Sequence, residues 1–323
     1  MAFNVLITGG AGFIGSNISE QLVKMEEIGL VRVIDNLETG FKGNIEALLP
    51  NKKFEFVEAD IRDFSVCGKC MEDIDVVLHQ AALGSVPRSV QNPINTNDFN
   101  ITGTLNVFFA AKEANVKKMV FASSSSTYGS NTDLPKLEDK IGDPLSPYAV
   151  TKLVSELYAR VFSNLYDFHF IGFRYFNVFG PRQSPSGAYA AVVPLFFKEM
   201  IQGRSPVING NGEQSRDFTY VRNVADINIG TIFNDNPASW NNIYNVACGY
   251  KTSLNGLYQH IAGLVGFTGE PVHGPDRKGD IRDSLADISK AVKLLNYVPR
   301  YSILEGLEQT YKWYLQNRDF LEA

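Results

Sequence analysis

A tyrosine and a lysine four residues apart are the residues of this chain whose types and spacing best suit chemistry. Tyr148 directly precedes, and Lys152 lies within, a segment (residues 149–162) whose pattern predicts a helix, and residues four apart share one helical face. Free tyrosine titrates near pH ~10, too high for a base at neutral pH. A neighbouring ammonium favours the phenolate and lowers that pKa. The pair therefore indicates a general base. Because surface helices often show the same spacing, the choice between a catalytic and a structural role depends on the elements that position the two residues.

The composition is that of an ordinary globular protein and indicates no charged macromolecular partner. The 323 residues carry a net charge of −5 and are 44% hydrophobic, so no basic field favours nucleic acid or a membrane surface. No run approaches the ~18 apolar residues of a spanning helix, and we expect no signal peptide. Three cysteines suit a reducing compartment, so the expected location is cytoplasmic. Cys67 and Cys70 lack the second pair that a zinc site needs, so we expect no metal and a structural role for both.

A glycine-rich turn near the N-terminus lies between a predicted buried strand at residues 3–7 and a helix predicted from Phe13 to about Ile28. Glycines at this spacing allow a tight turn and let the backbone and the helix N-terminus approach a pyrophosphate. The turn therefore predicts a dinucleotide site, and its glycines are Gly9, Gly12 and Gly15.

Asp35 ends the second predicted strand, residues 31–34, and follows Gly15 by twenty residues. An acidic residue at this distance accepts hydrogen bonds from the adenosine ribose, and its charge repels a 2′-phosphate. We therefore expect NAD in preference to NADP.

Strands and helices continue to alternate, which predicts an α/β fold with a Rossmann-type, doubly wound parallel sheet. Ligands bind at the carboxyl ends of the strands in such sheets. His79, within the fourth strand, is expected to be a hydrogen-bonded core residue. Four serines at 123–126 follow the fifth strand and are placed to contact a reacting hydroxyl. The further predicted strands span residues 54–60, 74–82, 118–122 and 170–174.

The alternation weakens after residue 174, where glycine- and proline-rich turns appear. We therefore expect an NAD-binding domain at 1–174 and a smaller α/β lobe that binds substrate at 175–323.

The chain resembles, nearly end to end, the extended short-chain dehydrogenase/reductase family. The likeness is greatest to nucleotide-sugar 4-epimerases, in particular those acting on UDP-N-acetylglucosamine. It rests on residues 8–15 (TGGAGFIG), 79–82 (HQAA), 123–129 (SSSSTYG), Tyr148 with Lys152, 174–180 (RYFNVFG) and 216–218 (RDF). In that family segments cross between the lobes, so residues of about 214–240 are expected to return to the first domain.

The resemblance implies a tightly bound NAD that is not exchanged during turnover. The residues implied to contact it are Gly9, Gly12, Phe13, Ile14, Gly15, Asp35, Asn36, Asp60, Ile61, Gln80, Ala81, Ala82, Asn100, Tyr148, Lys152 and Tyr175.

The resemblance also implies roles for three catalytic residues. Tyr148 takes the proton of the sugar 4-hydroxyl while NAD accepts the hydride, and the 4-keto sugar turns over and regains the hydride on its other face. Lys152 lowers the pKa of Tyr148 and bonds the nicotinamide ribose, and Ser124 bonds the 4-oxygen and relays the proton.

A UDP-sugar is the substrate that the resemblance implies. Arg216 and Arg277 match its diphosphate ligands, because guanidinium groups suit phosphate oxygens. Asp280 matches an acceptor for ribose hydroxyls. Ser284 stands where glucose-restricted relatives carry a tyrosine, so it leaves room for an acetamido group. The full implied set is Gly84, Ser85, Ser124, Ser125, Ser126, Tyr148, Asn177, Gln183, Ala191, Val192, Val207, Ile208, Asn209, Arg216, Arg277, Asp280 and Ser284.

The alternatives differ in substrate or in reaction. The same residues suit a 4-epimerase of UDP-glucose and UDP-galactose, or of the corresponding uronic acid, whose carboxylate Arg88 or Arg182 would receive. A 4,6-dehydratase needs an acid pair where this chain has Ser125 and Ser126. A non-catalytic NAD-binding scaffold is disfavoured because the tyrosine, lysine and serine are all present.

The helices predicted near residues 100–114 and 149–166 carry apolar residues on more than one face. Family members dimerise through such helices, so a homodimer built on a four-helix bundle is expected.

Overall fold

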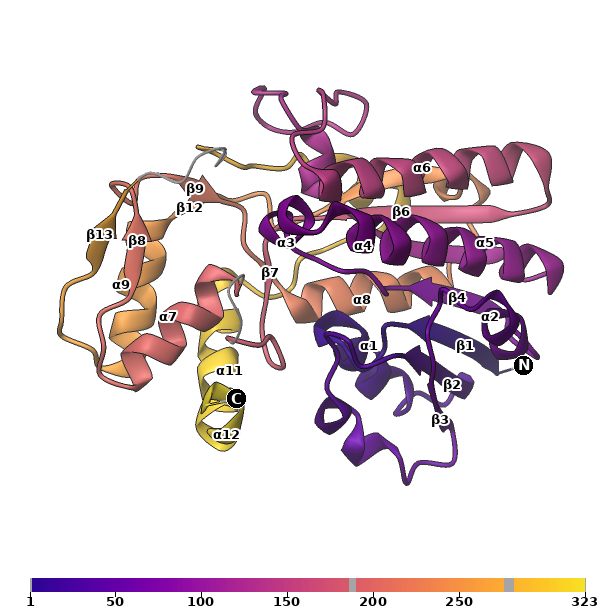
Figure 1. Ribbon diagram of the computed structural model, residues 1–323, viewed down its shortest axis with the longest axis horizontal. Coiled ribbons are helices and arrows are strands. Elements are labelled where there is room, and N and C mark those ends of the chain that lie inside the picture. Colours follow the sequence, from indigo (N-terminus) through magenta and orange to yellow (C-terminus); the bar gives the residue numbers. More distant parts are fainter. Residues whose placement is uncertain (1, 186–189, 276–281, 323) are drawn as a thin grey trace.

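The fold is built around one parallel β-sheet of seven strands. The computed structural model describes residues 2–185, 190–275 and 282–322, and its sheet has the order β11-β6-β5-β4-β1-β2-β3 (Figure 1). The predicted doubly wound parallel sheet is therefore confirmed. Its strands are β1 Phe3–Thr8, β2 Ile28–Asp35, β3 Phe54–Glu58, β4 Val76–His79, β5 Lys118–Ser124, β6 His169–Tyr175 and β11 Asn242–Val246.

The strands are apolar along their length because helices cover both faces of the sheet. Val5 and Ile7 of β1 pack in one buried cluster with helix residues such as Ile18, whereas Leu6 packs in a second cluster with Phe108. The first face is covered by α1 Phe13–Leu22, α8 Val221–Ile232 and α10 Ser289–Leu295, and the second by α2 Phe64–Cys70, α5 Gly103–Glu113 and α6 Pro147–Leu165.

Helix α1 ends earlier than the sequence predicts. Its last residue is Leu22, and Ile28, which the helical pattern includes, pairs with Phe3 as the first residue of β2. The apolar spacing of Met25 and Ile28 suits a helix and a buried strand start equally, and pairing with β1 decides between them.

A smaller lobe packs around its own apolar core, which includes Phe197, Ile208 and Leu307. It lies beside the open end of the sheet, on the left of Figure 1. The short helices α3 Val86–Gln91 and α4 Pro93–Asn97 pack against α6. The lobe and its connections contain β7 Val178–Phe179, α7 Val192–Ile201, β8 Val207–Asn209, β9 Ser215–Arg216, β10 Thr219–Tyr220, β12 Thr252–Ser253, α9 Leu254–Val265, β13 Val272–Gly274, α11 Ile303–Gln316 and α12 Asp319–Glu322.

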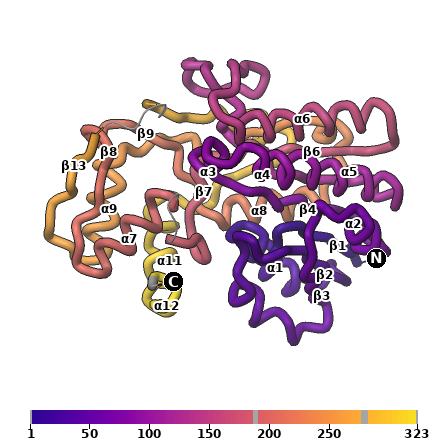
Figure 2. The backbone as a smooth tube through the Cα atoms, in the orientation of Figure 1, coloured from indigo at the N-terminus to yellow at the C-terminus, as the bar shows by residue number. Residues whose placement is uncertain are grey.

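The chain passes from the small lobe back to the sheet through α8 (Figure 2) and then forms β11. Helix α8 packs against α1, and β11 pairs with β6 over residues 242–246. The expected return segment, residues of about 214–240, therefore includes α8 but ends before β11, the strand that completes the sheet.

Cys67 and Cys70 are buried in α2, and both are free thiols that form no disulfide. Within the described ranges no group of histidine, cysteine or carboxylate side chains could hold a metal ion. Across the same ranges, none of the helices is long and apolar enough to cross a membrane.

Candidate active site

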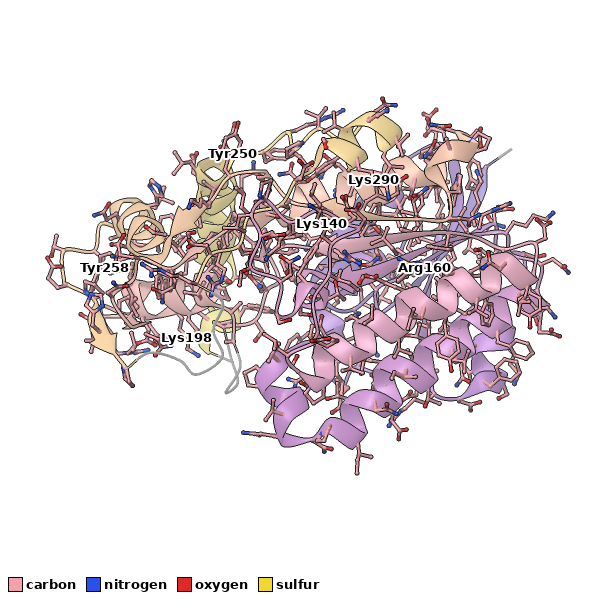
Figure 3. The ribbon with its side chains drawn as sticks, turned by 90° about the horizontal axis from the view of Figure 1, so that it is seen from above. Lys140, Arg160, Lys198, Tyr250, Tyr258 and Lys290 are labelled. Atoms are coloured by element: carbon pink, nitrogen blue, oxygen red, sulfur yellow. The ribbon has the colours of Figure 1, made fainter. Side chains whose placement is uncertain are left out.

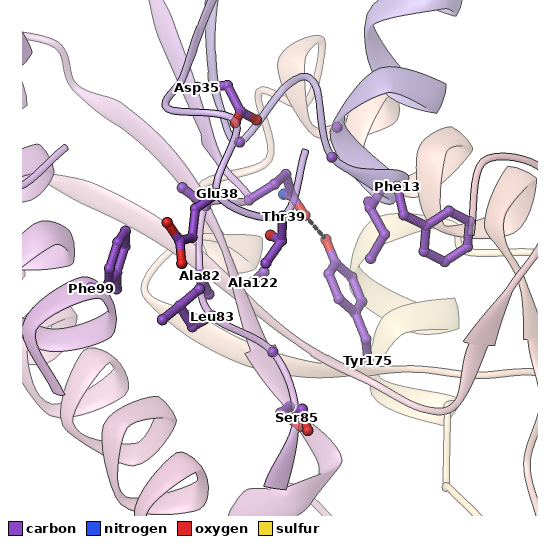
Figure 4. A pocket seen from close by; sticks show the side chains of 18 of the residues that line it. Phe13, Asp35, Glu38, Thr39, Ala82, Leu83, Ser85, Phe99, Ala122 and Tyr175 are labelled. Atoms are coloured by element: carbon purple, nitrogen blue, oxygen red, sulfur yellow. Dashed lines mark hydrogen bonds between the residues drawn. The ribbon is translucent and has the colours of Figure 1, made fainter. Parts of the chain in front are cut away.

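A cavity of about 570 Å³ opens at the carboxyl ends of the sheet strands and extends toward the small lobe. Figure 4 shows part of its lining, including Asp35, Phe99 and Tyr175. Every residue predicted to bind the cofactor lines this cavity except Asn100. Asn100 is instead buried, with its amide hydrogen-bonded to both backbone groups of Leu83 and to Thr151 Oγ1, so it fixes the cavity wall.

The glycine-rich turn is tight enough to require glycine at two positions. Gly9 has φ +70°, and a Cβ there would lie 2.7 Å from Ala81 Cα. A Cβ on Gly15 would lie 2.3 Å from the carbonyl oxygen of Gly9. This packing brings the start of α1 against β1 and leaves backbone N–H groups facing the cavity, as a dinucleotide pyrophosphate requires.

Asp35 lies at the end of β2 beside the glycine turn. Its carboxylate oxygens accept hydrogen bonds from Ala11 N at 3.0 Å and Leu37 N at 2.8 Å, and burial raises its pKa. Each carboxylate oxygen can accept a further hydrogen bond. The residues present therefore fit the adenosine ribose of NAD.

The adjoining part of the cavity is closed by side chains from the loop after β3. Asn36 Nδ2 donates to Asp60 Oδ2 at 2.9 Å, and the Arg62 guanidinium holds the pKa of Asp60 below its ordinary value. The same guanidinium lies 3.7 Å from the ring centroid of Phe99. Phe99 thus presents a fixed aromatic surface to the cavity.

Tyr175 is held by a hydrogen-bond network that the sequence does not indicate. Its hydroxyl donates to Gln80 Oε1 at 3.1 Å, drawn as a dashed line in Figure 4, and accepts from Asn228 Nδ2 at 2.9 Å. Asn228 comes from α8, more than fifty residues away along the chain. The network ties the ends of β4 and β6 to the helix that returns from the small lobe.

Helix α6 places Tyr148 and Lys152 in the cavity wall. Ser146 caps the helix by accepting from Ala149 N, and Pro147 occupies its first position, so Tyr148 lies in the first turn, where the helix dipole favours a phenolate. The Lys152 ammonium donates to the Ala122 carbonyl at 2.7 Å and lies 5.9 Å from the Tyr148 ring centroid. Burial lowers the pKa of Lys152 to about 8, so the lysine is still mostly a cation at neutral pH.

The pKa of Tyr148 differs from the sequence-based expectation. Burial raises it, and the opposing effect comes from a hydrogen bond with Ser124 and not from Lys152. The Ser124 Oγ accepts hydrogen bonds from Ser126 N at 3.1 Å and from Ser126 Oγ at 3.0 Å, which leaves its own proton for Tyr148. Ser124 is therefore a further group that favours the phenolate, beside the Lys152 ammonium predicted from the sequence.

The core assignment of His79 is confirmed. Its Nδ1 lies 2.6 Å from Thr8 Oγ1 and its Nε2 lies 2.9 Å from Thr104 Oγ1. Burial lowers the pKa of His79 to about 3, so the ring is a neutral link between β1, β4 and α5.

The predicted substrate residues divide into three groups. Those that line the cavity are Gly84, Ser85, Ser124, Tyr148, Asn177, Gln183 and Ala191. Arg277 and Asp280 lie outside the described residues. The cavity lining does not include Ser125, Ser126, Val192, Val207, Ile208, Asn209, Arg216 or Ser284.

The last group falls outside the cavity for different reasons. The Ile208 side chain is buried in the core of the small lobe, so only its backbone could contact a ligand. Ser126 acts on Ser124 and not on the cavity directly. The Arg216 guanidinium donates to the carbonyls of Ser215 and Arg282, which places it next to the segment that leads to Arg277.

Two of the lining residues have unusual backbones for residues with side chains. Ser85 has φ +110° and Asn177 has φ +36°. Strained conformations of this kind cluster at functional sites. Ser85 also caps α3, accepting from Arg88 N at 3.3 Å.

Sequence reasoning missed several lining residues, among them Glu38, Thr39, Leu83 and Phe99. Glu38 and Thr39 follow Asp35 in the same loop, so their place in the chain was an available signal. Phe99 comes from a helical turn that no local pattern connects with the cavity.

The comparisons with known proteins agree with this geometry. Residues 5–247 match the model of the NAD dependent epimerase/dehydratase family. The chain belongs to this family. The match spans the glycine turn, the Tyr148–Lys152 helix and β11, and so covers the sheet except for the first two residues of β1, together with the cavity wall.

Three relatives cover nearly the whole chain. A UDP-glucose 4-epimerase of Mycolicibacterium smegmatis is 37% identical over 96% of this chain and 97% of its own length. A UDP-N-acetylglucosamine 4-epimerase from Methanobrevibacter ruminantium M1, solved with UDP-N-acetylmuramic acid, is 39% identical with a TM-score of 0.92 over 98% of this chain and 100% of that one. A UDP-glucuronic acid 4-epimerase from Bacillus cereus, solved with UDP-glucuronic acid and NAD, is 30% identical with a TM-score of 0.89 over 98% and 100%.

Proposed function

We propose that this protein is a UDP-sugar 4-epimerase whose substrates are UDP-N-acetylglucosamine and UDP-N-acetylgalactosamine. The observation that carries the proposal is the meeting of Ser124, Tyr148 and Lys152 at one wall of a dinucleotide-type cavity. Relatives of nearly full length that act as 4-epimerases of UDP-sugars support the reaction type.

Each of the three residues has a role in the proposed reaction. Bound NAD supplies the hydride acceptor and donor, and tight binding is part of the proposal because the same hydride must return. Tyr148, as phenolate, takes the proton of the 4-hydroxyl. Ser124 bonds the 4-oxygen and stabilises the phenolate. Lys152, fixed by the Ala122 carbonyl, places a cation beside the ring.

Gln183 supports an acetylated sugar. The residue lines the cavity, and its amide nitrogen donates to the Val178 carbonyl at 3.0 Å. Its amide oxygen is buried and has no hydrogen-bond donor among the described residues. A buried carbonyl without a donor costs about 1–3 kcal/mol, which the N–H of an acetamido group would relieve. The relative from Methanobrevibacter ruminantium M1, named for UDP-N-acetylglucosamine, supports the same choice.

An assay of the purified protein with four substrates tests the proposal. UDP-N-acetylglucosamine, UDP-glucose, UDP-N-acetylglucosaminuronic acid and UDP-glucuronic acid are each incubated with the enzyme, and products are separated by chromatography. We expect the highest kcat/KM for UDP-N-acetylglucosamine. A preference of tenfold or more for a non-acetylated sugar would refute the substrate assignment and leave the reaction type standing.

The Ser284 position provides a test of the sugar preference. Ser284 is half-buried, and its N–H donates to the Ser215 carbonyl. We expect Ser284→Tyr to lower kcat/KM for the acetylated sugar about tenfold or more, and that for UDP-glucose much less, because the proposal places the acetamido group beside this position, where a tyrosine ring would clash with it. The matched control Ser284→Ala keeps a small side chain and should leave both values unchanged. Equal losses on both sugars in the tyrosine variant would contradict the assignment.

A uronic acid is the second candidate substrate, and Arg88 favours it. Arg88 lines the cavity, and its guanidinium has no ion-pair partner among the described residues. Arg182, the other arginine considered, bonds Glu20 at 2.7 Å and the Ser16 carbonyl at 3.2 Å, so it is already engaged. The two uronic acids in the assay decide whether Arg88 receives a carboxylate.

The proposal includes a homodimer through a four-helix bundle, to which each chain contributes α5 and α6. These helices pack against each other (Figure 3, where Arg160 marks α6), and their exposed apolar residues include Phe109, Leu157 and Val161. Phe108 is buried within the chain and takes no part. We expect a mass of two chains in solution and a single-chain mass for the variant Leu157→Glu with Val161→Glu. A single-chain mass for the unaltered protein would refute the dimer.

A further inference from the structure

A fully buried ion pair lies two helical turns from Tyr148. Glu156 of α6 and Arg174 of β6 each expose about 1% of their side chains. The guanidinium donates from Nε to Glu156 Oε1 at 2.9 Å and from Nη2 to Oε2 at 2.7 Å. This paired geometry joins the catalytic helix to the strand that ends in Tyr175.

Three consecutive residues of β5 contact the same helix at three points. The Ala122 carbonyl accepts from Lys152 Nζ at 2.7 Å. The Ser123 hydroxyl donates to Glu156 Oε1 at 2.6 Å. Ser124 and Tyr148 both line the cavity, and the Ser124 side chain acts to lower the pKa of Tyr148. The end of β5 thus contacts three successive turns of α6. The last of these turns carries Glu156 of the buried ion pair.

The remaining donors of Arg174 extend the cluster to the loops at the same edge of the sheet. Nη1 donates to the Glu138 carbonyl at 2.9 Å, and the guanidinium lies 4.8 Å from the ring centroid of Tyr128. The Tyr128 hydroxyl donates to Asn245 Oδ1 of β11 at 2.6 Å. Four elements of the fold therefore meet at one guanidinium.

A buried ion pair is a poor way to gain stability. Desolvation offsets the attraction, and apolar residues of similar volume are often as stabilising. The directional hydrogen bonds of the pair, however, allow one register of α6 on β5 and β6, which apolar packing would not specify as sharply. Ser123 adds a bond from the residue next to Ser124, so a slip of the helix would separate Tyr148 from Ser124.

We propose that Glu156, Arg174 and Ser123 are positioning residues that hold Tyr148 against Ser124 in the geometry that the reaction needs. The inference rests on the proposed function for its activity readout. A second readout, the titration of Tyr148, needs no substrate and therefore does not depend on the proposed function.

The test replaces the pair without leaving a buried charge. The double variant Glu156→Met with Arg174→Met keeps side-chain volume and net charge. We expect its melting temperature to stay within about 5 °C. We expect kcat to fall about tenfold with KM nearly unchanged, and the acid limb of the kcat–pH profile to move up by about one unit, because Tyr148 loses a well-placed Ser124. A folded double variant with unaltered kcat and pH profile would overturn the proposal.

Two further variants keep the test decisive. Arg32→Met with Glu55→Met removes an ion pair of 2.8 Å between β2 and β3, far from Tyr148, and should leave the pH profile unchanged. Ser123→Ala removes only the strand contact and leaves Glu156 paired with Arg174. If the double variant does not fold, a threefold loss of kcat with the same upward shift in Ser123→Ala supports the proposal, and no change overturns it.

The titration of Tyr148 separates this proposal from the proposed function. Ring-labelled tyrosine is followed by NMR against pH, and the resonance of Tyr148 is assigned by its absence from Tyr148→Phe. We expect the double variant and Ser123→Ala to titrate at higher pH than the unaltered protein. If no UDP-sugar is turned over, the proposed function fails while this measurement still decides the positioning role. Identical titration in all variants would overturn it.

Discussion

Tyr148→Phe is expected to lower kcat for the preferred UDP-sugar by about 10²- to 10⁴-fold, the contribution of a positioned general base. The ring is half-buried in the wall of the cavity, so removing one oxygen leaves its packing in place. The bound cofactor and the affinity for the nucleotide should therefore change little. Product formation, cofactor content and thermal unfolding, measured on the same preparation, check the three parts of this expectation.

Tyr158→Phe is the matched control for that experiment. Tyr158 lies ten residues further along α6, packs partly buried against the core on the same face of the sheet, and has no hydrogen bond to its hydroxyl among the described residues. Its variant should keep full activity. If Tyr148→Phe retained more than about a tenth of the activity, the base would have to be another residue, since a lost general base costs more than that.

The dinucleotide half of the site could be predicted from the sequence because its signals are local. Gly9, Gly12 and Gly15 lie within seven residues. The close backbone contacts of Gly12 and Gly15 are with other residues of the same turn. Asp35 follows at a spacing that the lengths of one helix and one strand set. Neighbours in the chain are neighbours in this part of the fold.

The rest of the cavity wall could not be predicted as well because its residues meet only through tertiary packing. Asn100, predicted as a cofactor ligand, is buried, and its amide bonds Leu83 and Thr151, which no local sequence pattern indicates. Asn228 and Phe99 gave no local signal, although both help to form the cavity wall.

The pKa of Tyr148 could not be predicted from the sequence either, because it depends on burial in the folded protein. Spacing places a cation near the phenol, but the sign of the pKa shift depends on how deeply both groups are buried. Burial disfavours the phenolate and the ammonium alike, and it raises the pKa of Tyr148 while lowering that of Lys152. The Ser124 side chain, which acts to lower the pKa of Tyr148, is then a part of the site on which the proposed base depends.

Gly15→Ala is expected to abolish cofactor binding and to destabilise the protein. A Cβ at this position would lie 2.3 Å from the Gly9 carbonyl oxygen and 2.7 Å from Gly10 Cα. Both are backbone atoms of the turn that would hold the pyrophosphate, so the first turn of α1 must move away from β1. Overpacking of this kind costs about 1–3 kcal/mol. The alanine gains about 1 kcal/mol of helix propensity in return, so the urea midpoint should still fall.

Gly68→Ala separates the steric effect from the general effect of replacing a helical glycine. Gly68 lies within α2, and a Cβ there would meet no atom within 4 Å. This variant should gain up to about 1 kcal/mol in free energy of unfolding and keep its cofactor. The decisive comparison is NAD content after gel filtration. A cofactor-loaded Gly15→Ala protein as stable as Gly68→Ala would mean that the turn tolerates a side chain, and that the close approach of α1 to β1 does not form the pyrophosphate site.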